Sequence, residues 1–267
     1  MIKYPEISPE IIRIGPLAVR WYGMMYLLGF ASSYLLVKYQ IKKHGSTENR
    51  KLNRMLPLSG VDSLYSYLIL GLLLGARLGY VVFYNMSYYV QHPLEVFAVW
   101  HGGMSFHGGL IGSIVAGVLF CNQFRVDFWQ TADFVIATAP IGIGLGRLGN
   151  FINAELYGRV ADLPWAMIFP GGGPFPRHPS QLYEFFLEGF VLFIVMWTVK
   201  DRGLKTGALT SFFIVFYGAF RFFVEFFREP DAQVGYLFGI ITMGQALSAA
   251  MVLIGVGLLR YRTKHGE

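Results

Sequence analysis

Residues 134–158 read FVIATAPIGIGLGRLGNFINAELYG, and this stretch decides how the rest of the chain is interpreted. An apolar run over residues 134–145 stops just before Arg147, and two asparagines and a glutamate follow. Arginine offers a planar fork suited to phosphate or carboxylate. The plain alternative is a helix end with a snorkelling arginine and a capping asparagine. So many polar groups at the end of an apolar run favour a functional site.

The composition is that of a membrane protein. Of 267 residues, 54% are hydrophobic and only 14% are charged, whereas soluble domains carry about 25% charged residues. The single cysteine, Cys121, excludes an internal disulfide and a cysteine metal cluster. Because no soluble domain of useful size remains, we expect residues 1–267 to form one integral-membrane domain.

Apolar runs long enough to cross a bilayer, about 20 residues each, occur at about seven places. We therefore expect an all-α polytopic membrane protein with about seven transmembrane helices. The expected spans are 17–38, 61–84, 102–120, 130–147, 181–199, 207–228 and 237–259. Pro140 predicts a kink in the fourth span, because proline removes a helical hydrogen bond.

Basic residues set the orientation, because loops rich in Lys and Arg stay in the cytoplasm. Seven spans place most basic loop and tail residues on one side. These are Lys38, Lys42, Lys43, Arg50, Lys51, Arg54, Arg125, Lys200, Arg202, Lys205, Arg260, Arg262 and Lys264. We expect a periplasmic N-terminus and a cytoplasmic C-terminus. Since the net charge of +6 is then a topology signal, we exclude nucleic acid as a partner.

In this topology, the charged and polar residues within the apolar spans lie at a similar depth in the bilayer. Arg20, Arg77, Arg147, Arg221 and His107 all fall in the outer half of the bilayer or at its outer lip. A charge in hydrocarbon costs roughly 3 kcal/mol on translocon scales, so such residues usually face a cavity or one another. We therefore expect a polar chamber in the outer half of the bilayer.

The sixth span carries charges on one helix face. Tyr217, Arg221, Glu225 and Arg228 follow at spacings of four, four and three residues. Arg221 and Glu225 either form a structural ion pair, or Glu225 holds the Arg221 fork in place for a bound phosphate.

His107 lies between two Gly-Gly pairs and is either a packing residue or a candidate base, because its ordinary pKa lies near neutrality. Tyr22 and Tyr26 lie one turn apart in the first span, where interface aromatics are common. Arginines, a histidine and carboxamides at this depth fit an anionic phospholipid headgroup. The indicated reaction is displacement at the carbon that bears a lipid phosphate, with arginine stabilising the departing phosphate.

Long ordered motifs run through nearly the whole chain. They are WYG at 21–23, GGMSFHGG at 102–109, GRLGNFINAELYG at 146–158, RHPSQLYE at 177–184, YGAFR at 217–221 and EFFR at 225–228. In these motifs the chain resembles the bacterial phosphatidylglycerol–prolipoprotein diacylglyceryl transferases.

The resemblance implies an enzyme of the bacterial inner membrane with its active site towards the periplasm. It implies transfer of the sn-1,2-diacylglyceryl group from phosphatidylglycerol to the lipobox cysteine of a preprolipoprotein signal peptide. A thioether forms and glycerol phosphate leaves, as the first step of lipoprotein maturation. No cofactor or metal is implied, and membrane lipids surround the enzyme.

The family's site residues carry over by motif position. Arg147 and Arg221 are expected to hold and stabilise the phosphate, and His107 is a candidate base. The alternative is deprotonation assisted by an arginine-organised phosphate; either route must supply a thiolate. The matching residues expected to bind substrate or shape the site are Tyr22, Asn150, Asn153, Glu155, Gly158, Tyr217 and Glu225. Arg77 lies outside these motifs and is expected to bind substrate because of its depth in the bilayer.

Two other classes of protein compete with this interpretation. A transporter for an anionic solute tends to place its polar groups near the membrane midplane, whereas here they lie towards one face. A structural scaffold would leave Arg77, Arg147 and Arg221 as costs without a benefit.

Overall fold

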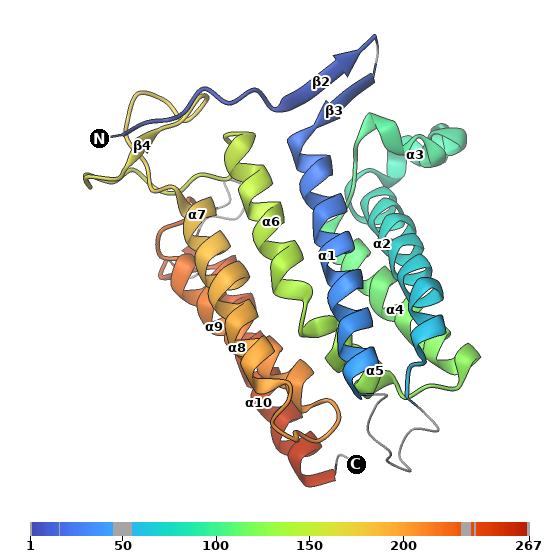
Figure 1. Ribbon diagram of the computed structural model, residues 1–267. Helices are drawn as coiled ribbons and strands as arrows, with labels where there is room; N and C mark the ends of the chain where they lie inside the picture. Colours follow the sequence, from blue (N-terminus) through green and yellow to red (C-terminus); the bar gives the residue numbers. More distant parts are fainter. Residues whose placement is uncertain (1, 16, 45–54, 231–235, 238, 266–267) are drawn as a thin grey trace. The chain divides into compact units, whose positions relative to one another are not determined.

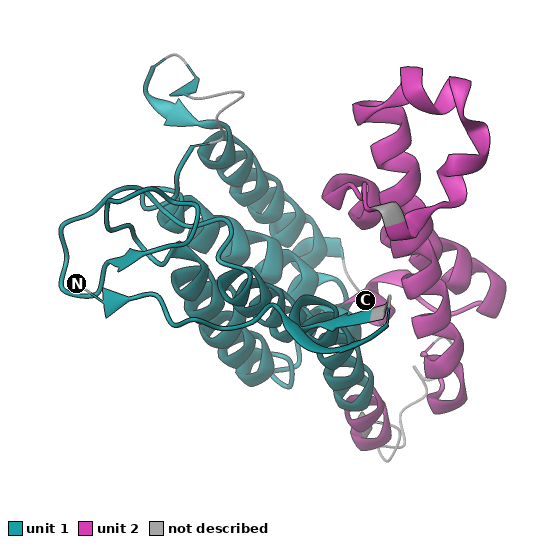
Figure 2. Cartoon of the chain, turned by 90° about the horizontal axis from the view of Figure 1, so that it is seen from above, with its two compact units in different colours: residues 1–37, 133–267 teal, residues 38–132 magenta. Residues whose placement is uncertain are grey.

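A computed structural model describes residues 2–15, 17–44, 55–230, 236–237 and 239–265 of the chain. The chain divides into two compact units (Figure 2). The first contains residues 1–37 and 133–267, and the second contains residues 38–132. Three of the basic residues that set the expected orientation, Arg50, Lys51 and Arg54, lie outside the described residues.

In the first unit, helices run beside one another, with β2, β3 and β4 at one end and the end of α10 at the other (Figure 1). Its helices are α1 (Trp21–His44, which continues into the second unit), the end of α5 (Phe128–Ile136), α6 (Ala139–Ile152), α7 (Ser180–Glu184), α8 (Leu192–Val199), α9 (Ala208–Val224) and α10 (Met243–His265). A π-helical turn, η5 (Phe185–Val191), joins α7 to α8.

In the described part of the chain, three short two-stranded sheets accompany these helices. Strand β1 (Ile2–Lys3) pairs in parallel with β4 (Met167–Ile168). The antiparallel pairs are β2 (Glu10–Ile14) with β3 (Leu17–Arg20), and β5 (Tyr236–Leu237) with β6 (Ile241–Thr242).

Among its described residues, the second unit contains two long helices, the end of α1 and several short elements. Besides the end of α1, these are η2 (Leu58–Gly60), α2 (Val61–Tyr84), α3 (Met86–Gln91), η3 (Pro93–Phe97), η4 (Val99–His101), α4 (Phe106–Phe124) and the start of α5.

Among the described residues, four helical stretches are long and apolar enough to cross a membrane. They are Leu58–Tyr84, Phe106–Phe124, Ser180–Val199 and Met243–His265. The pair α5 and α6 adds a fifth as one bent span, with an angle of 44° at the break. Pro140 lies in the first turn of α6, so the kink predicted there is confirmed. The mostly helical, multi-pass membrane architecture is also confirmed.

The structure corrects the predicted starts of the first and the last helix. It also corrects the all-α description, because short strands are present. Residues 17–20 do not begin the first helix, because they pair with β2 in a hairpin. The last helix begins at Met243 rather than at 237, because β5 and β6 pair just before it; residue 238 lies outside the described residues. The structure is therefore helical in its apolar stretches and carries short strands outside them.

Asp133 of α5 fixes the start of α9. Its carboxylate accepts hydrogen bonds from the backbone N–H groups of Gly207 at 2.6 Å and Thr210 at 2.7 Å, and from the Thr210 hydroxyl at 2.6 Å. An acidic side chain at a helix N-terminus satisfies orphan donors and complements the helix dipole. This contact sets the position of α9, which carries Arg221.

Helices α2 and α4 pack through glycines. A Cβ added at Gly112 would overlap the carbonyl group of Gly71, and one at Gly75 would overlap that of Gly108. Small residues let helix backbones approach closely inside a membrane. The register of α4 against α2 is therefore fixed by these contacts.

We predict that Gly112→Ala lowers the unfolding free energy by about 1–3 kcal/mol, the usual cost of overpacking. Thermal unfolding in detergent measures the change. Gly117→Ala in the same helix is the matched control, because its Cβ would meet only ordinary contacts at 3.8 Å. Equal midpoints for the two variants would contradict the proposed packing.

Candidate functional site

Glu184, at the end of α7, is the centre of a group of buried charges. Its side chain is only 1% exposed. Arg221 and Arg228 each donate from Nη1 to Glu184 Oε1, at 2.6 and 2.7 Å. The Nε atom of Arg147 lies 2.7 Å from Glu184 Oε2. Three arginines from separate segments thus meet at one carboxylate.

Two further carboxylates complete this group. Glu225 Oε2 lies 3.1 Å from Arg221 Nη2, and Thr242 donates to Glu225 Oε1 at 3.1 Å. Glu188 is fully buried, with its nearest guanidinium contacts at 3.8 and 3.9 Å, too long for hydrogen bonds. We call this set the arginine–glutamate cluster; it consists of Arg147, Arg221, Arg228, Glu184, Glu188 and Glu225.

The cluster depends on a close approach between α6 and η5. A Cβ on Gly144 would lie 2.9 Å from the Cα atom of Gly189, so the two backbones nearly touch there. Arg147 follows Gly144 by about one turn of α6 and therefore reaches the carboxylates beside Gly189. The π-helical turn that carries Glu188 is a distortion that is frequent at functional sites.

The sequence anticipates the pair of Arg221 and Glu225 in this cluster and misses Glu188. The expected contact between Arg221 and Glu225 is present at 3.1 Å. Glu188 is not singled out by sequence reasoning, although its spacing of four from Glu184 inside an apolar stretch was a usable signal. The central place of Glu184 depends on contacts between α6, α7 and α9, which spacing alone does not give.

The turn after α6 gathers two asparagines around Glu155. Asn150 and Asn153 both donate from Nδ2 to Glu155 Oε1, at 2.8 and 3.3 Å. The flanking residues Ala154 and Leu156 have φ of +53° and +57°. This left-handed conformation costs roughly 1–2 kcal/mol for a residue other than glycine. Such strain clusters at functional sites, and here it turns Glu155 back towards both asparagines.

Two tyrosines lie close to Arg147. Tyr22 of α1 packs on α6, where a Cβ on Gly149 would lie 2.9 Å from its ring, and it interacts with the charges of Arg147 and Glu155. Tyr217 of α9 lies close enough to Arg147 to interact with its charge. The first unit thus brings together Tyr22, Arg147, Asn150, Asn153, Glu155, Tyr217, Arg221 and Glu225.

Gly158 lies in the segment outside the helices. Its N–H group donates to the carbonyl oxygen of His178 at 2.9 Å. An added Cβ would overlap the Phe227 carbonyl oxygen and would lie 2.8 Å from the His178 Cβ atom. A glycine therefore allows this segment to lie directly on the chain that follows α9.

His178 itself is held in a small aromatic group. Tyr183 lies between it and Trp165: the indole N–H donates to the Tyr183 hydroxyl at 2.8 Å, and that hydroxyl lies 3.1 Å from His178 Nδ1. Burial, followed by the nearby charge of Arg159, lowers the pKa of His178 below its ordinary value of 6.5. The neutral ring is therefore the form that this environment stabilises.

The remaining predicted residues, Arg77 and His107, belong to the second unit. His107 is exposed in the first turn of α4. Arg77 is buried in α2 and donates only to backbone carbonyl groups, without an acidic partner in the hydrogen bonds described. That His107 shares one chamber with the arginine–glutamate cluster stays a prediction.

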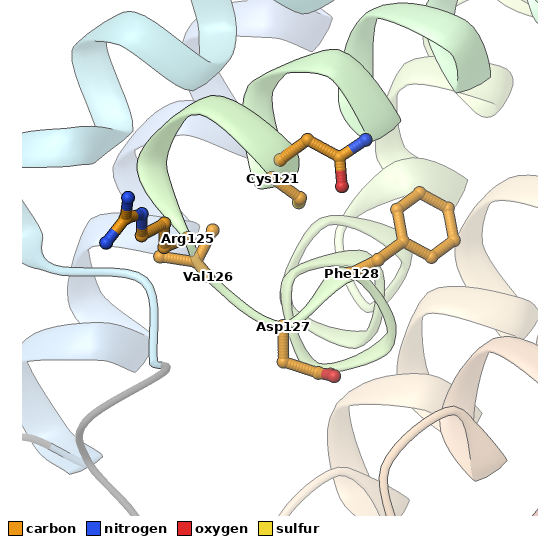
Figure 3. Close-up of a pocket in the computed structure, with 6 residues that line it drawn as sticks. Cys121, Arg125, Val126, Asp127 and Phe128 are labelled. Atoms are coloured by element: carbon orange, nitrogen blue, oxygen red, sulfur yellow. The ribbon is translucent and has the colours of Figure 1, made fainter.

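A separate hollow of about 300 Å³ lies at the turn between α4 and α5 (Figure 3). Cys121, Arg125 and Asp127 are among its lining residues. It is at the opposite end of α4 from His107. No group of three His, Cys, Asp or Glu side chains suited to a metal ion occurs in the part of the chain that the structure describes.

The fold and the cluster define a class: a multi-pass helical membrane protein with a charged site built on its apolar helices. A family model described as prolipoprotein diacylglyceryl transferase matches residues 9–261. The chain therefore belongs to the prolipoprotein diacylglyceryl transferase family.

Several relatives are similar over almost their full length. A phosphatidylglycerol–prolipoprotein diacylglyceryl transferase of Desulfotalea psychrophila is 53% identical over 264 residues, which cover 97% of this chain and 94% of the relative. The enzyme of the same name from Geobacter sulfurreducens is 52% identical, over 96% of this chain and 95% of the relative. That from Pseudomonas aeruginosa is 47% identical, over 97% and 95%.

We predict that Glu184→Gln lowers the unfolding free energy by about 3–5 kcal/mol, because removing one partner leaves buried charges uncompensated. Thermal unfolding in detergent measures the loss. Glu229→Gln is the control, since Glu229 pairs with Arg177 but is 51% exposed; we expect a change of about 1 kcal/mol or less. A similar small change in both variants would contradict the central role of Glu184.

We also predict a pH-dependent loss of stability from His178. Because its pKa is lowered on folding, the unfolded chain takes up a proton first as the pH falls. The stabilisation is complete above the unfolded pKa of about 6.5 and is lost as the pH falls through the folded pKa. Melting temperatures between pH 7.5 and 5 should fall less steeply for His178→Gln than for the wild type. Parallel curves would exclude this contribution.

Proposed function

We propose that this protein transfers the sn-1,2-diacylglyceryl group of phosphatidylglycerol to the lipobox cysteine of a preprolipoprotein. The observation that carries the proposal is the set of contacts that the guanidinium group of Arg147 makes with the buried carboxylates. Its Nε atom lies 2.7 Å from Glu184 Oε2, and its closest approach to Glu188 is 3.8 Å, from Nη2. Glu184 therefore orients the guanidinium group through Nε, while the approach to Glu188 is too long for a hydrogen bond. An oriented guanidinium fork suits bidentate contact with a phosphate.

The reaction is a displacement at carbon. The substrate thiol loses its proton, and the sulfur attacks the glyceryl carbon that bears the phosphate oxygen. A C–S bond forms, the C–O bond breaks, and glycerol phosphate leaves with that oxygen and the electron pair. Arg147 and Arg221 stabilise the charge that develops on the leaving phosphate. Because the thiolate is the reactive form, His107 is proposed as the base that takes the thiol proton.

Other residues of the first unit prepare the site. Glu184 and Glu225 fix the guanidinium groups through contacts of 2.6 to 3.1 Å. Asn150 and Asn153 hold Glu155 at the same end of α6. We assign substrate binding or site shaping to Tyr22, Asn150, Asn153, Glu155, Gly158, Tyr217 and Glu225. No cofactor or metal enters this scheme.

The proposed setting is the bacterial inner membrane, with the site towards the periplasm. We add α1 and α9 to the five apolar stretches, which gives seven spans; α1 has 24 residues and α9 has 17. The N-terminus is then periplasmic and the C-terminus cytoplasmic. Both units form one catalytic domain of residues 1–267, with a polar chamber in the outer half of the bilayer. Its partners are phosphatidylglycerol, the signal peptide and the surrounding lipids, and not nucleic acid.

The direct test adds phosphatidylglycerol and a lipobox peptide to the purified protein in detergent. We predict that the peptide gains the mass of one diacylglyceryl group, and that a Cys-to-Ser peptide gains none. No gain by protein that is folded and binds phosphatidylglycerol would contradict the proposal and favour an anionic-solute transporter.

Two variants then test the arginines. Arg147→Lys and Arg221→Lys keep the charge but lose the planar fork. We predict that each lowers kcat by about 10²-fold or more, as for loss of one donor to a developing oxyanion. Arg202→Lys, at an exposed site, is the matched control. Wild-type rates in both variants would exclude a role for Arg147 and Arg221 in stabilising the phosphate.

A further inference from the structure

Arg77 makes an unusual number of bonds to one segment of backbone. Its side chain leaves the second half of α2, and the residue is 4% exposed. Its Nε donates to the carbonyl oxygen of Val96 at 2.7 Å, and Nη2 donates to those of Glu95 and Ala98 at 2.6 and 3.2 Å. Its Nη1 donates to those of Gly102 and Gly103 at 2.6 and 3.1 Å.

These five bonds use all five N–H groups that a guanidinium carries. The guanidinium also lies over the ring of Tyr89, 5.1 Å from its centroid. Arg77 therefore has no N–H group left for a lipid phosphate in this conformation, in contrast to the role expected from the sequence.

The segment that Arg77 holds, residues 95–103, needs such a partner. It contains the end of η3 and all of η4, followed by Gly102 and Gly103 at φ of +83° and +76°. Short turns leave carbonyl groups without partners in a regular ladder. One buried guanidinium satisfies five of them at once.

The same anchoring continues into the first turn of α4. The N–H group of Ser105 donates to the carbonyl oxygen of Ala76, next to Arg77, at 2.9 Å. The hydroxyl of Ser105 accepts from the N–H group of Gly108 at 3.2 Å and caps the helix. His107 lies between Ser105 and Gly108 in the chain. The bond from Ser105 to Ala76 therefore fixes the backbone of His107 relative to α2.

We infer that Arg77 is a positioning residue: by holding the carbonyl groups of residues 95–103, it sets the place of His107 at the start of α4. The inference rests on the proposed role of His107 as base. It separates Arg77 from Arg147 and Arg221, which are proposed to touch the lipid phosphate.

The two roles differ in kinetics. A phosphate ligand that binds the lipid before reaction affects the KM for phosphatidylglycerol. A residue that places the base affects kcat, because a displacement of about 1 Å in a reacting group can cost about 10²-fold.

The test compares Arg77→Gln and Arg77→Lys with the wild type, by steady-state kinetics on monodisperse protein and by hydrogen exchange of peptides that cover residues 95–106. Arg125→Gln, an exposed arginine at the far end of α4, is the control. We expect Arg77→Gln to lower kcat about 10²-fold, to leave the KM for phosphatidylglycerol unchanged, and to speed exchange in this segment. Arg77→Lys keeps three donors, so its kcat and exchange rate should lie between those of the wild type and of Arg77→Gln. It also serves as the test variant if Arg77→Gln does not fold.

A raised KM with an unchanged kcat would overturn the inference and make Arg77 a lipid ligand. Faster exchange with an unchanged kcat, or unchanged exchange, would overturn it as well. If the wild type transfers no diacylglyceryl group, the proposed function fails instead, and the exchange measurement still decides whether Arg77 anchors the segment.

Discussion

The contact of Glu184 with three arginines is the constraint on which the site depends. Guanidinium groups from α6, from α9 and from the residues after α9 lie within 2.7 Å of its two oxygens. Without this carboxylate, three buried positive charges would repel one another in surroundings that screen them weakly. With it, the ends of three chain segments are tied together, and the arginines are oriented before any substrate arrives. Preorganised charge of this kind needs little rearrangement during a reaction.

Close backbone packing makes this arrangement possible. The near contact of Gly144 with Gly189 brings the arginine of α6 to the carboxylates of α7 and η5. In the second unit, glycines fix α4 on α2, and Arg77 extends the same control to the chain that leads into His107. Both units therefore use small residues to set the distance between helices. Charged side chains then determine where the adjoining chain segments lie.

Much of this architecture can be predicted from the sequence where the cause is local. The helix over residues 61–84 is predicted to the residue, because a mostly apolar run has its length. Pro140 marks the break between α5 and α6, and a spacing of four predicts the pair of Arg221 and Glu225. Residues 17–20 are apolar enough to suggest helix, but their pairing with β2 is a contact that the run itself does not reveal.

The central place of Glu184 and the burial of Glu188 arise from contacts between segments distant in sequence. Periodicity assigns each charge to a helix face but does not say which faces meet. The five carbonyl partners of Arg77 escape prediction for the same reason, since they lie in irregular turns without a periodic pattern.

The central claim is that Arg147 and Arg221 hold the lipid phosphate. The most direct test is solid-state NMR of dipolar coupling between ³¹P of bound phosphatidylglycerol and ¹⁵N of the arginine side chains, assigned with Arg147→Lys and Arg221→Lys. The account predicts ³¹P dephasing by guanidinium nitrogens in the wild type, reduced in each variant. Dephasing that is absent while the lipid is bound, or that persists in both variants, would contradict it.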